Sequence, residues 1–426
     1  MNTMLKYFIS AILVVELIFI FSCKKDSTTS SDCPNCPSVT SLSPSAGHGG
    51  DTITISGNNF AASPLDEVVK INGKIISPDS VLSSNASRIV AIVPVGCGSG
   101  KVTVDLDAEL TNTGTPPDFT YLFQAVVTTF AGRWDNAIHT PDFGTNTPID
   151  TTFFNGPSLI HIVDDVIFLT DNNANVITKI SNFSTSSDIG INIDNSPIDF
   201  FSSNHKIYFL ESGFDNLNLV YFYQIQEITL GYPQLLFDTI DYSNNSSYYG
   251  ASMDANGHIY ILNNIFRQSS NITDSTIIMK STDATATTFN QVFQQNGELL
   301  SKLKFKNGFL YALSSGNNKI YKISVTTNSI VDTYFLGTAF NGNAISDFTV
   351  DTNGKIYFVS ANYNILYYFS SQNTVVELAS NASIGHADGI GSQASFNRPD
   401  GIDIDSQGRL FIIDRDNYCI RKVNLQ

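Results

Sequence analysis

The chain has 426 residues and a formal net charge of −16, although only 15% of its residues are charged. An acidic chain repels phosphate backbones, which argues against nucleic acid as a partner. Gly, Asn, Ser, Thr and aromatic residues are plentiful while helical periodicity is scarce, and about 400 residues follow an apolar N-terminal segment, enough for two or three domains.

The N-terminal segment is typical of an export signal. Tyr7 to Ser22 is almost wholly apolar and follows Lys6. Its roughly 16 residues are short of the ~20 that a helix needs to cross a bilayer. A charged start, an apolar middle and a small residue are typical of a secretory signal. We therefore expect residues 1–22 to be a signal peptide, with an uncleaved anchor as the alternative.

The end of this segment, Ile20-Phe21-Ser22-Cys23, resembles a bacterial lipobox, in which the cysteine is lipidated and becomes the new N-terminus. Cys23-Lys24-Lys25-Asp26 also resembles lipoproteins of the Bacteroidetes group, where such a string can direct display on the outer face. The resemblance implies an outer-membrane lipoprotein, anchored through lipid on Cys23 and exposed at the cell surface, with the periplasmic leaflet as the alternative. Residues 23–36 are rich in Ser and Thr and are expected to be a flexible tether.

Cys33 and Cys36 form a CxxC pair in this tether. No second CxxC completes a zinc site, and no βαβ pattern surrounds the pair to suggest a redox role. A local disulfide is therefore the preferred interpretation. Pairing of Cys97 with the tether remains an alternative.

Short strands separated by turns follow over residues 37–124. Thr52 to Ser56 alternates polar and apolar residues, as a half-buried strand does, and lies between Gly49-Gly50 and Gly57-Asn58. Further strands are expected at 67–72, 88–93, 101–106 and 119–123. This spacing predicts a β-sandwich.

Several motifs here resemble an IPT/TIG domain, an immunoglobulin-like module: Ser43-Pro44, Gly49-Gly50, Ile53 to Phe60, Val93-Pro94, Gly98-Ser99-Gly100 and Val102-Thr103-Val104. Members of that family often act as spacers or contact modules and carry no catalysis. The resemblance implies the same for residues 37–124.

The remaining residues, 125–426, repeat. An apolar-aromatic pair recurs every 40 to 54 residues, as Ile167-Phe168, Ile207-Tyr208, Ile259-Tyr260, Leu310-Tyr311, Ile356-Tyr357 and Leu410-Phe411. Turn dipeptides such as Asn307-Gly308 precede several pairs and are typical of hairpins. Units of about 50 residues, each with room for four strands, predict a six-bladed β-propeller. The fold class is thus all-β, an immunoglobulin-like sandwich followed by a six-bladed propeller.

The units that begin at Phe154 and Phe396 share Phe-Asn-x-Pro-like starts, an aspartate at Asp171 or Asp414 and a closing Ile-x-Lys pattern. The last unit resembles an NHL repeat. Asp414 and Asn417 are expected to cap turns. Because Val423 lies near the last residue, we expect the strand-like segment from Ala125 to Gly132 to supply the outer strand of the sixth blade and close the ring.

Six-bladed propellers bind ligands at the axis or on the face that carries the outer-to-inner and second-to-third-strand loops. Segments from Glu211 and Asn263 are predicted to be the longest such loops, and long loops are often functional. The candidate ligand-binding residues are Tyr248, Tyr249, Phe214, Phe266, Arg267 and Arg398. The alternative is that the aromatic residues pack between blades.

Lactonases and amidating lyases share this architecture and hold a metal at the axis. His161 is expected on a first strand while His205 and His258 lie at turns, so these histidines are not expected to converge. Asp171, Glu211 and Asn263 could supply oxygen ligands. The sequence contains no Gly-x-Ser-x-Gly, HExxH, phosphate-binding glycine or calcium loop.

We therefore predict no catalytic residue, metal or cofactor. The expected function is binding of an extracellular glycan or protein by a monomer, and a metal-dependent propeller enzyme of lactonase or lyase type is the alternative. Glycan binding would depend on tyrosine, because Trp134 is the only tryptophan.

Overall fold

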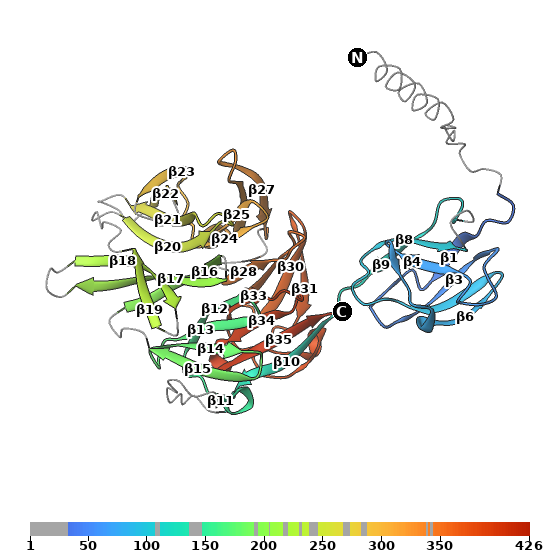
Figure 1. Cartoon of the computed structure of the whole chain (residues 1–426), viewed down its shortest axis with the longest axis horizontal. Coiled ribbons are helices and arrows are strands. Elements are labelled where there is room, and N and C mark those ends of the chain that lie inside the picture. The colour runs from blue at the N-terminus through green and yellow to red at the C-terminus, as the bar shows by residue number, and fades with distance from the viewer. Residues whose placement is uncertain are drawn as a thin grey trace, which may run out of the picture. The chain divides into compact units, whose positions relative to one another are not determined.

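The computed structural model describes residues 33–106, 111–135, 147–190, 195–203, 205–215, 220–229, 232–237, 246–266, 273–282, 288–337, 340 and 344–426. The described chain is built from β-strands and single turns of 3-10 helix, as predicted (Figure 1). It divides into two compact units, one ending at Leu122 and one running from Phe123 to Gln426. Among the described residues no helix is long and apolar enough to cross a membrane. Cys23 lies outside them.

The first unit is a sandwich of two sheets in its described part. One sheet has the order β1 (Ser38–Ser43), β3 (Thr52–Asn58), β7 (Arg88–Ile92), β6 (Val81–Asn85). The other has the order β2 (Ala46–Gly47), β9 (Asp118–Tyr121), β8 (Gly100–Asp105), β4 (Val68–Ile71), β5 (Lys74–Ile75). The alternation in β3 buries Ile53 and Ile55 completely in the core. Cys33 and Cys36 form a disulfide, and Cys97 is a buried free thiol.

The second unit contains six sheets in its described part, and these are the blades of a propeller (Figure 1). Blade 1 comprises β12 (Pro157–Val163), β13 (Val166–Asp171), β14 (Val176–Ser181) and β15 (Thr185–Gly190), with the short β11 (Thr147–Pro148) beside β15. Blade 2 comprises β16 (Asn195–Ser203), β17 (Lys206–Asp215), β18 (Val220–Thr229) and β19 (Tyr232–Phe237). Blade 3 comprises β20 (Ser246–Met253), β21 (Ile259–Phe266), β22 (Thr273–Ser281) and β23 (Phe289–Asn296).

Blade 4 comprises β24 (Lys302–Lys306), β25 (Phe309–Ser314), β26 (Lys319–Ser324) and β27 (Ser329–Phe335). Blade 5 comprises β28 (Asp347–Val350), β29 (Ile356–Ser360), β30 (Ile365–Ser371) and β31 (Thr374–Ala379). Blade 6 comprises β33 (Pro399–Ile404), β34 (Leu410–Asp414), β35 (Cys419–Leu425) and β10 (Ala125–Gly132), with β32 (Gly389–Ile390) beside β10. All six predicted apolar-aromatic pairs lie in the second strands of the blades.

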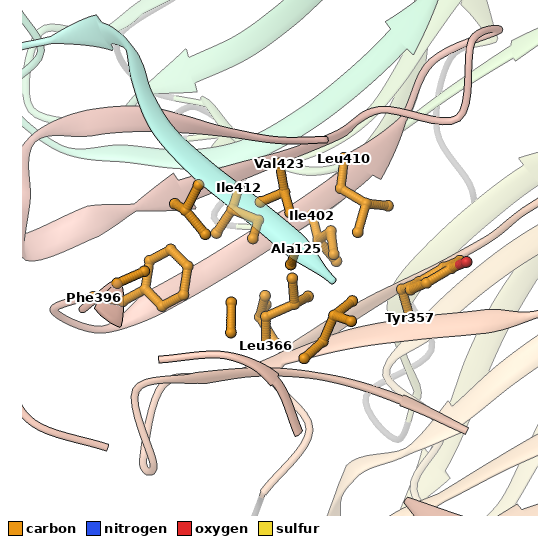
Figure 2. Close-up of a cluster of buried hydrophobic side chains, with 13 residues drawn as sticks. Ala125, Tyr357, Leu366, Phe396, Ile402, Leu410, Ile412 and Val423 are labelled. Carbon is orange, nitrogen blue, oxygen red and sulfur yellow. The ribbon is translucent and has the colours of Figure 1, made fainter. Parts of the chain in front are cut away.

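Blade 6 joins segments from the two ends of the propeller sequence, as predicted. Strand β10 pairs antiparallel with β35, from Ala125 opposite Leu425 to Gly132 opposite Cys419. Figure 2 shows β10 crossing the buried cluster that Ala125 shares with Val423 and residues of blades 5 and 6. Hydrogen bonding and apolar burial therefore close the ring together.

The predicted starts of the long loops of blades 2 and 3, at Glu211 and Asn263, were wrong, because both residues lie within strands. Strand β17 extends to Asp215, with Phe214 opposite Tyr221, and β21 extends to Phe266. Gly213 and Asp215 have weak intrinsic strand propensity, which favoured the loop interpretation. Pairing with the long β18 overrides that local preference.

Candidate functional site

A cavity of about 170 Å³ lies on the propeller axis. Each of the innermost strands β12, β16, β20, β24, β28 and β33 contributes to its lining. A site to which every blade contributes exists only when the ring is closed.

One residue from each blade forms what we call the axial ring. Its members occupy the same place in each blade, directly opposite the aromatic residue of the apolar-aromatic pair, and all line the cavity. They are His161, Phe201, Ser252, Lys304, Thr349 and Asp403. Residues two positions earlier face the same side of their strands, and these include Asp199, Lys302 and Asp347.

Three buried aspartates join neighbouring blades. Asp199 Oδ2 accepts the Ala251 N–H at 3.2 Å, Asp347 Oδ2 accepts that of Ile402 at 3.2 Å, and Asp403 Oδ2 accepts that of Ile162 at 2.9 Å.

The second oxygen of each aspartate is also occupied. The backbone N–H groups of Phe200, Phe348 and Ile404 donate to the Oδ1 atoms of Asp199, Asp347 and Asp403, and Thr349 Oγ1 donates to Asp403 Oδ1 at 2.9 Å. Each of these carboxylates therefore accepts one N–H group from its own strand and one from the innermost strand of the next blade.

Polar residues make the same kind of link elsewhere in the ring. The Phe305 N–H donates to Ser252 Oγ at 2.8 Å, which joins blade 4 to blade 3. His161 Nε2 lies 2.8 Å from Ser202 Oγ and joins blade 1 to blade 2. His161 Nδ1 lies 3.1 Å from Asp403 Oδ2, but the angle does not allow a hydrogen bond between them.

Strand β24 carries what we call the lysine column, Lys302, Lys304 and Lys306. The alternating sequence Lys-Leu-Lys-Phe-Lys turns all three side chains to one face of the strand, and Lys304 and Lys306 line the cavity. Within the described chain, no carboxylate oxygen lies within 4.0 Å of any of the three ammonium groups, and none of them donates a hydrogen bond.

The aspartates nevertheless set the charge of Lys304 from a longer distance. Burial alone would lower the pKa of Lys304, but Asp347, Asp403 and Asp199 together raise it above its ordinary value. Burial would raise the pKa of Asp403, and Lys304, His161 and the Ile162 N–H lower it instead. The Lys304 side chain is therefore a charged ammonium at the cavity, and no residue of the described chain accepts a hydrogen bond from it.

The sequence-predicted ligand residues lie away from this cavity. Tyr248 is buried in the cluster between blades 2 and 3, where it packs with Phe201 and Ala251. Tyr249 and Phe266 are half-buried.

The remaining candidate ligand residues, Arg398, Phe214 and Arg267, either do not line the axial cavity or have side chains outside the described part of the chain. The Arg398 side chain is 51% exposed and lies 4.0 Å from Asp416. The side chain of Phe214 and all of Arg267 lie outside the described part.

Asp171 and Asp414, the aspartates shared by the first and last repeat units, accept hydrogen bonds that cap turns, as predicted. Asp171 accepts the Asn155 and Gly156 N–H groups, and Asp414 accepts the Asn397 N–H at 2.7 Å and the Asn417 amide at 2.8 Å. Among the described residues, no group of three or more His, Cys, Asp or Glu is arranged to hold a metal ion.

Sequence reasoning considered only His161 of the axial ring and missed the lysine column. Two signals were present. One is the residue opposite each repeated aromatic, and the other is the concentration of three lysines in five residues of an acidic chain.

Comparison with known proteins agrees with this architecture. Residues 37–121 match the model of the IPT/TIG domain family. A structural genomics protein of unknown function from Bacteroides thetaiotaomicron superposes with a TM-score of 0.57 at 15% identity, over 93% of this chain and 99% of its own.

Two auxiliary nutrient binding proteins share the fold at similar levels. The one from Bacteroides ovatus has a TM-score of 0.52 at 17% identity over 92% of this chain and 99% of its own. The one from Bacteroides thetaiotaomicron has a TM-score of 0.53 at 18% identity over 93% and 100%. No curated protein matches the chain.

Proposed function

We propose that this chain is a cell-envelope lipoprotein whose propeller binds an extracellular ligand, a glycan or a protein, with the IPT/TIG domain as spacer. Residues 1–22 serve as the signal peptide, lipid on Cys23 anchors the chain at the outer membrane, and residues 23–36 are the tether. The observation that carries the binding role is the axial cavity, where the half-buried Lys304 of β24 presents an ammonium for which the described chain supplies no hydrogen-bond acceptor. Water or a ligand in the cavity can accept hydrogen bonds from this group.

The comparisons support the same proposal. Two neighbours that share the fold over more than nine-tenths of this chain are called auxiliary nutrient binding proteins. Concave sites with a few convergent polar groups are typical of small-ligand binding.

The test uses the chain from Lys24 to Gln426, which lacks the lipid-bearing cysteine. It is incubated with immobilised polysaccharides, and both retention and soluble products are measured. Retention without products is expected. Products that disappear on addition of a chelator would instead establish a metal-dependent enzyme, and the absence of both retention and products would leave a protein as the partner.

A further inference from the structure

We propose that the axial cavity binds a small carboxylate, either the uronic acid unit of a glycan or a free organic acid, through Lys304 and Lys306. This inference rests on the proposed binding function and names the chemistry of its ligand.

The lysine column is unusual for its surroundings. The chain has only 23 Lys and Arg residues against 39 Asp and Glu, yet three lysines share one innermost strand. Charged groups inside proteins are normally paired and hydrogen-bonded. Several lysines elsewhere meet this expectation, such as Lys70 at 2.8 Å from Asp105 and Lys319 at 3.3 Å from Glu298. In the described chain Lys304 and Lys306 have no such partner, although both line the cavity.

The aspartates around the axis do not fill this role. Both oxygens of Asp199, Asp347 and Asp403 accept backbone N–H groups, and Asp403 accepts the Thr349 hydroxyl as well. Ser252 Oγ accepts the Phe305 N–H, which leaves its hydroxyl hydrogen to donate. Lys304, Lys306 and Ser252 therefore offer hydrogen-bond donors to a ligand, and a ligand must bring acceptors.

The size of the cavity limits the ligand. A volume of about 170 Å³ equals the space of about six water molecules, and it is smaller than the roughly 300–1,000 Å³ of drug-sized pockets. One sugar ring or the end of a chain fits this space. Phe201, Phe305 and Met253 are among the apolar residues of its lining.

Two opposing electrostatic effects act on an anionic ligand in the cavity. Asp199, Asp347 and Asp403, which act on Lys304 through space, repel an anion, while Lys304 and Lys306 attract it. The proposed ligand is a singly charged carboxylate, and inorganic phosphate is the probe that tests a doubly charged ligand.

Isothermal titration calorimetry on the chain from Lys24 to Gln426 tests the proposal with galacturonate, galactose and inorganic phosphate as probes. We expect galacturonate to bind at least about tenfold more tightly than galactose, and more weakly as salt is added because salt screens charge. Lys306→Gln should weaken galacturonate binding by about tenfold, and Lys304→Gln should abolish it. Lys101→Gln in the sandwich is the matched control and should leave binding unchanged, because that lysine belongs to the first unit and pairs with Asp118 of the same unit.

Several outcomes overturn the proposal. Equal binding of galactose and galacturonate, phosphate binding without galacturonate, or galacturonate binding that survives both lysine substitutions would each do so. Lys306 is half-buried and lines the cavity, so Lys306→Gln remains informative where Lys304→Gln unfolds the ring. Polysaccharide retention without binding of any probe would overturn the carboxylate site and leave the proposed function standing. Absence of both polysaccharide retention and probe binding would overturn the carboxylate site and leave a protein as the partner.

Discussion

Arg421 shows how one side chain can organise a blade. It is fully buried in β35, and its Nη1 donates to Asp414 Oδ2 and the Ser395 carbonyl at 2.8 and 2.9 Å. Its Nη2 donates to Asp388 Oδ1 and the Ala387 carbonyl, each at 2.8 Å. The planar fork of the guanidinium thus holds the connection ahead of β33 against the third strand of blade 6.

Lysine cannot reproduce this fork, because it has a single ammonium point charge. We predict that Arg421→Lys lowers the free energy of unfolding by about 3 kcal/mol, since one ammonium cannot reach Asp414, Asp388 and the two carbonyls that the buried guanidinium joins. Chemical denaturation measures this change. Arg398→Lys is the matched control, expected to cost less than about 0.5 kcal/mol because that side chain is half-exposed. Equal effects of the two substitutions would show that the buried network is not what stabilises the blade.

At the scale of elements, the sixth blade depends on a strand that precedes the other five blades in sequence. Val127 of β10 is fully buried in the cluster that also contains Ala125, Val423 and Leu410. Thr129, two residues further along on the same face of the strand, is exposed. Closure therefore needs the apolar face of β10 as well as its backbone hydrogen bonds with β35.

A matched pair of substitutions tests how much the apolar side chains of β10 contribute to closure. Val127→Asn places an amide in the apolar cluster without hydrogen-bond partners and should cost about 3 kcal/mol. Thr129→Asn keeps the strand and should change stability by less than about 1 kcal/mol. Thermal unfolding of both variants in the full mature chain is the measurement. A Val127→Asn protein as stable as the parent would show that β10 is dispensable for closure.

For the whole molecule, tyrosines buried between blades link stability to pH. Burial, followed by the nearby charges of Tyr334, Asp332 and Asp351, raises the pKa of Tyr311 from 10.0 to about 12. Burial also raises the pKa values of Tyr260, Tyr321, Tyr357 and Tyr367. The folded protein holds these phenol protons more tightly than the unfolded chain does.

The sign of the pH effect follows from this difference. The stabilisation is fully present below the unfolded pKa of 10.0 and is lost as pH rises toward about 12, because the unfolded chain ionises first. We predict that the free energy of unfolding falls over this window, and that tyrosinate absorbance from the buried residues rises only together with loss of the β-sheet circular dichroism. Complete tyrosine titration near pH 10 with the dichroism intact would contradict the prediction.

The parts of the fold that sequence reasoning predicted correctly depend on local patterns. The pair Ile356-Tyr357 follows the turn Asn353-Gly354, and such hairpins repeat along the chain, so the number of blades could be counted. The strand-like segment from Ala125 to Gly132, which lies between the sandwich and blade 1, identified the closing strand. The failed prediction, the loop from Glu211, concerns residues whose local preference was overridden by pairing with a neighbouring strand.

The sequence by itself therefore determined the two architectures, the number of blades, the closing strand and the caps at Asp414 and Asn417. Only the tertiary structure decided that Lys304 faces Asp347, Asp403 and Asp199, and that Tyr248 packs between blades. The physical reason is that these axial residues come from different blades, tens to hundreds of residues apart, and no local preference relates them. Their charges and donors meet only when the closed ring brings the innermost strands around one axis.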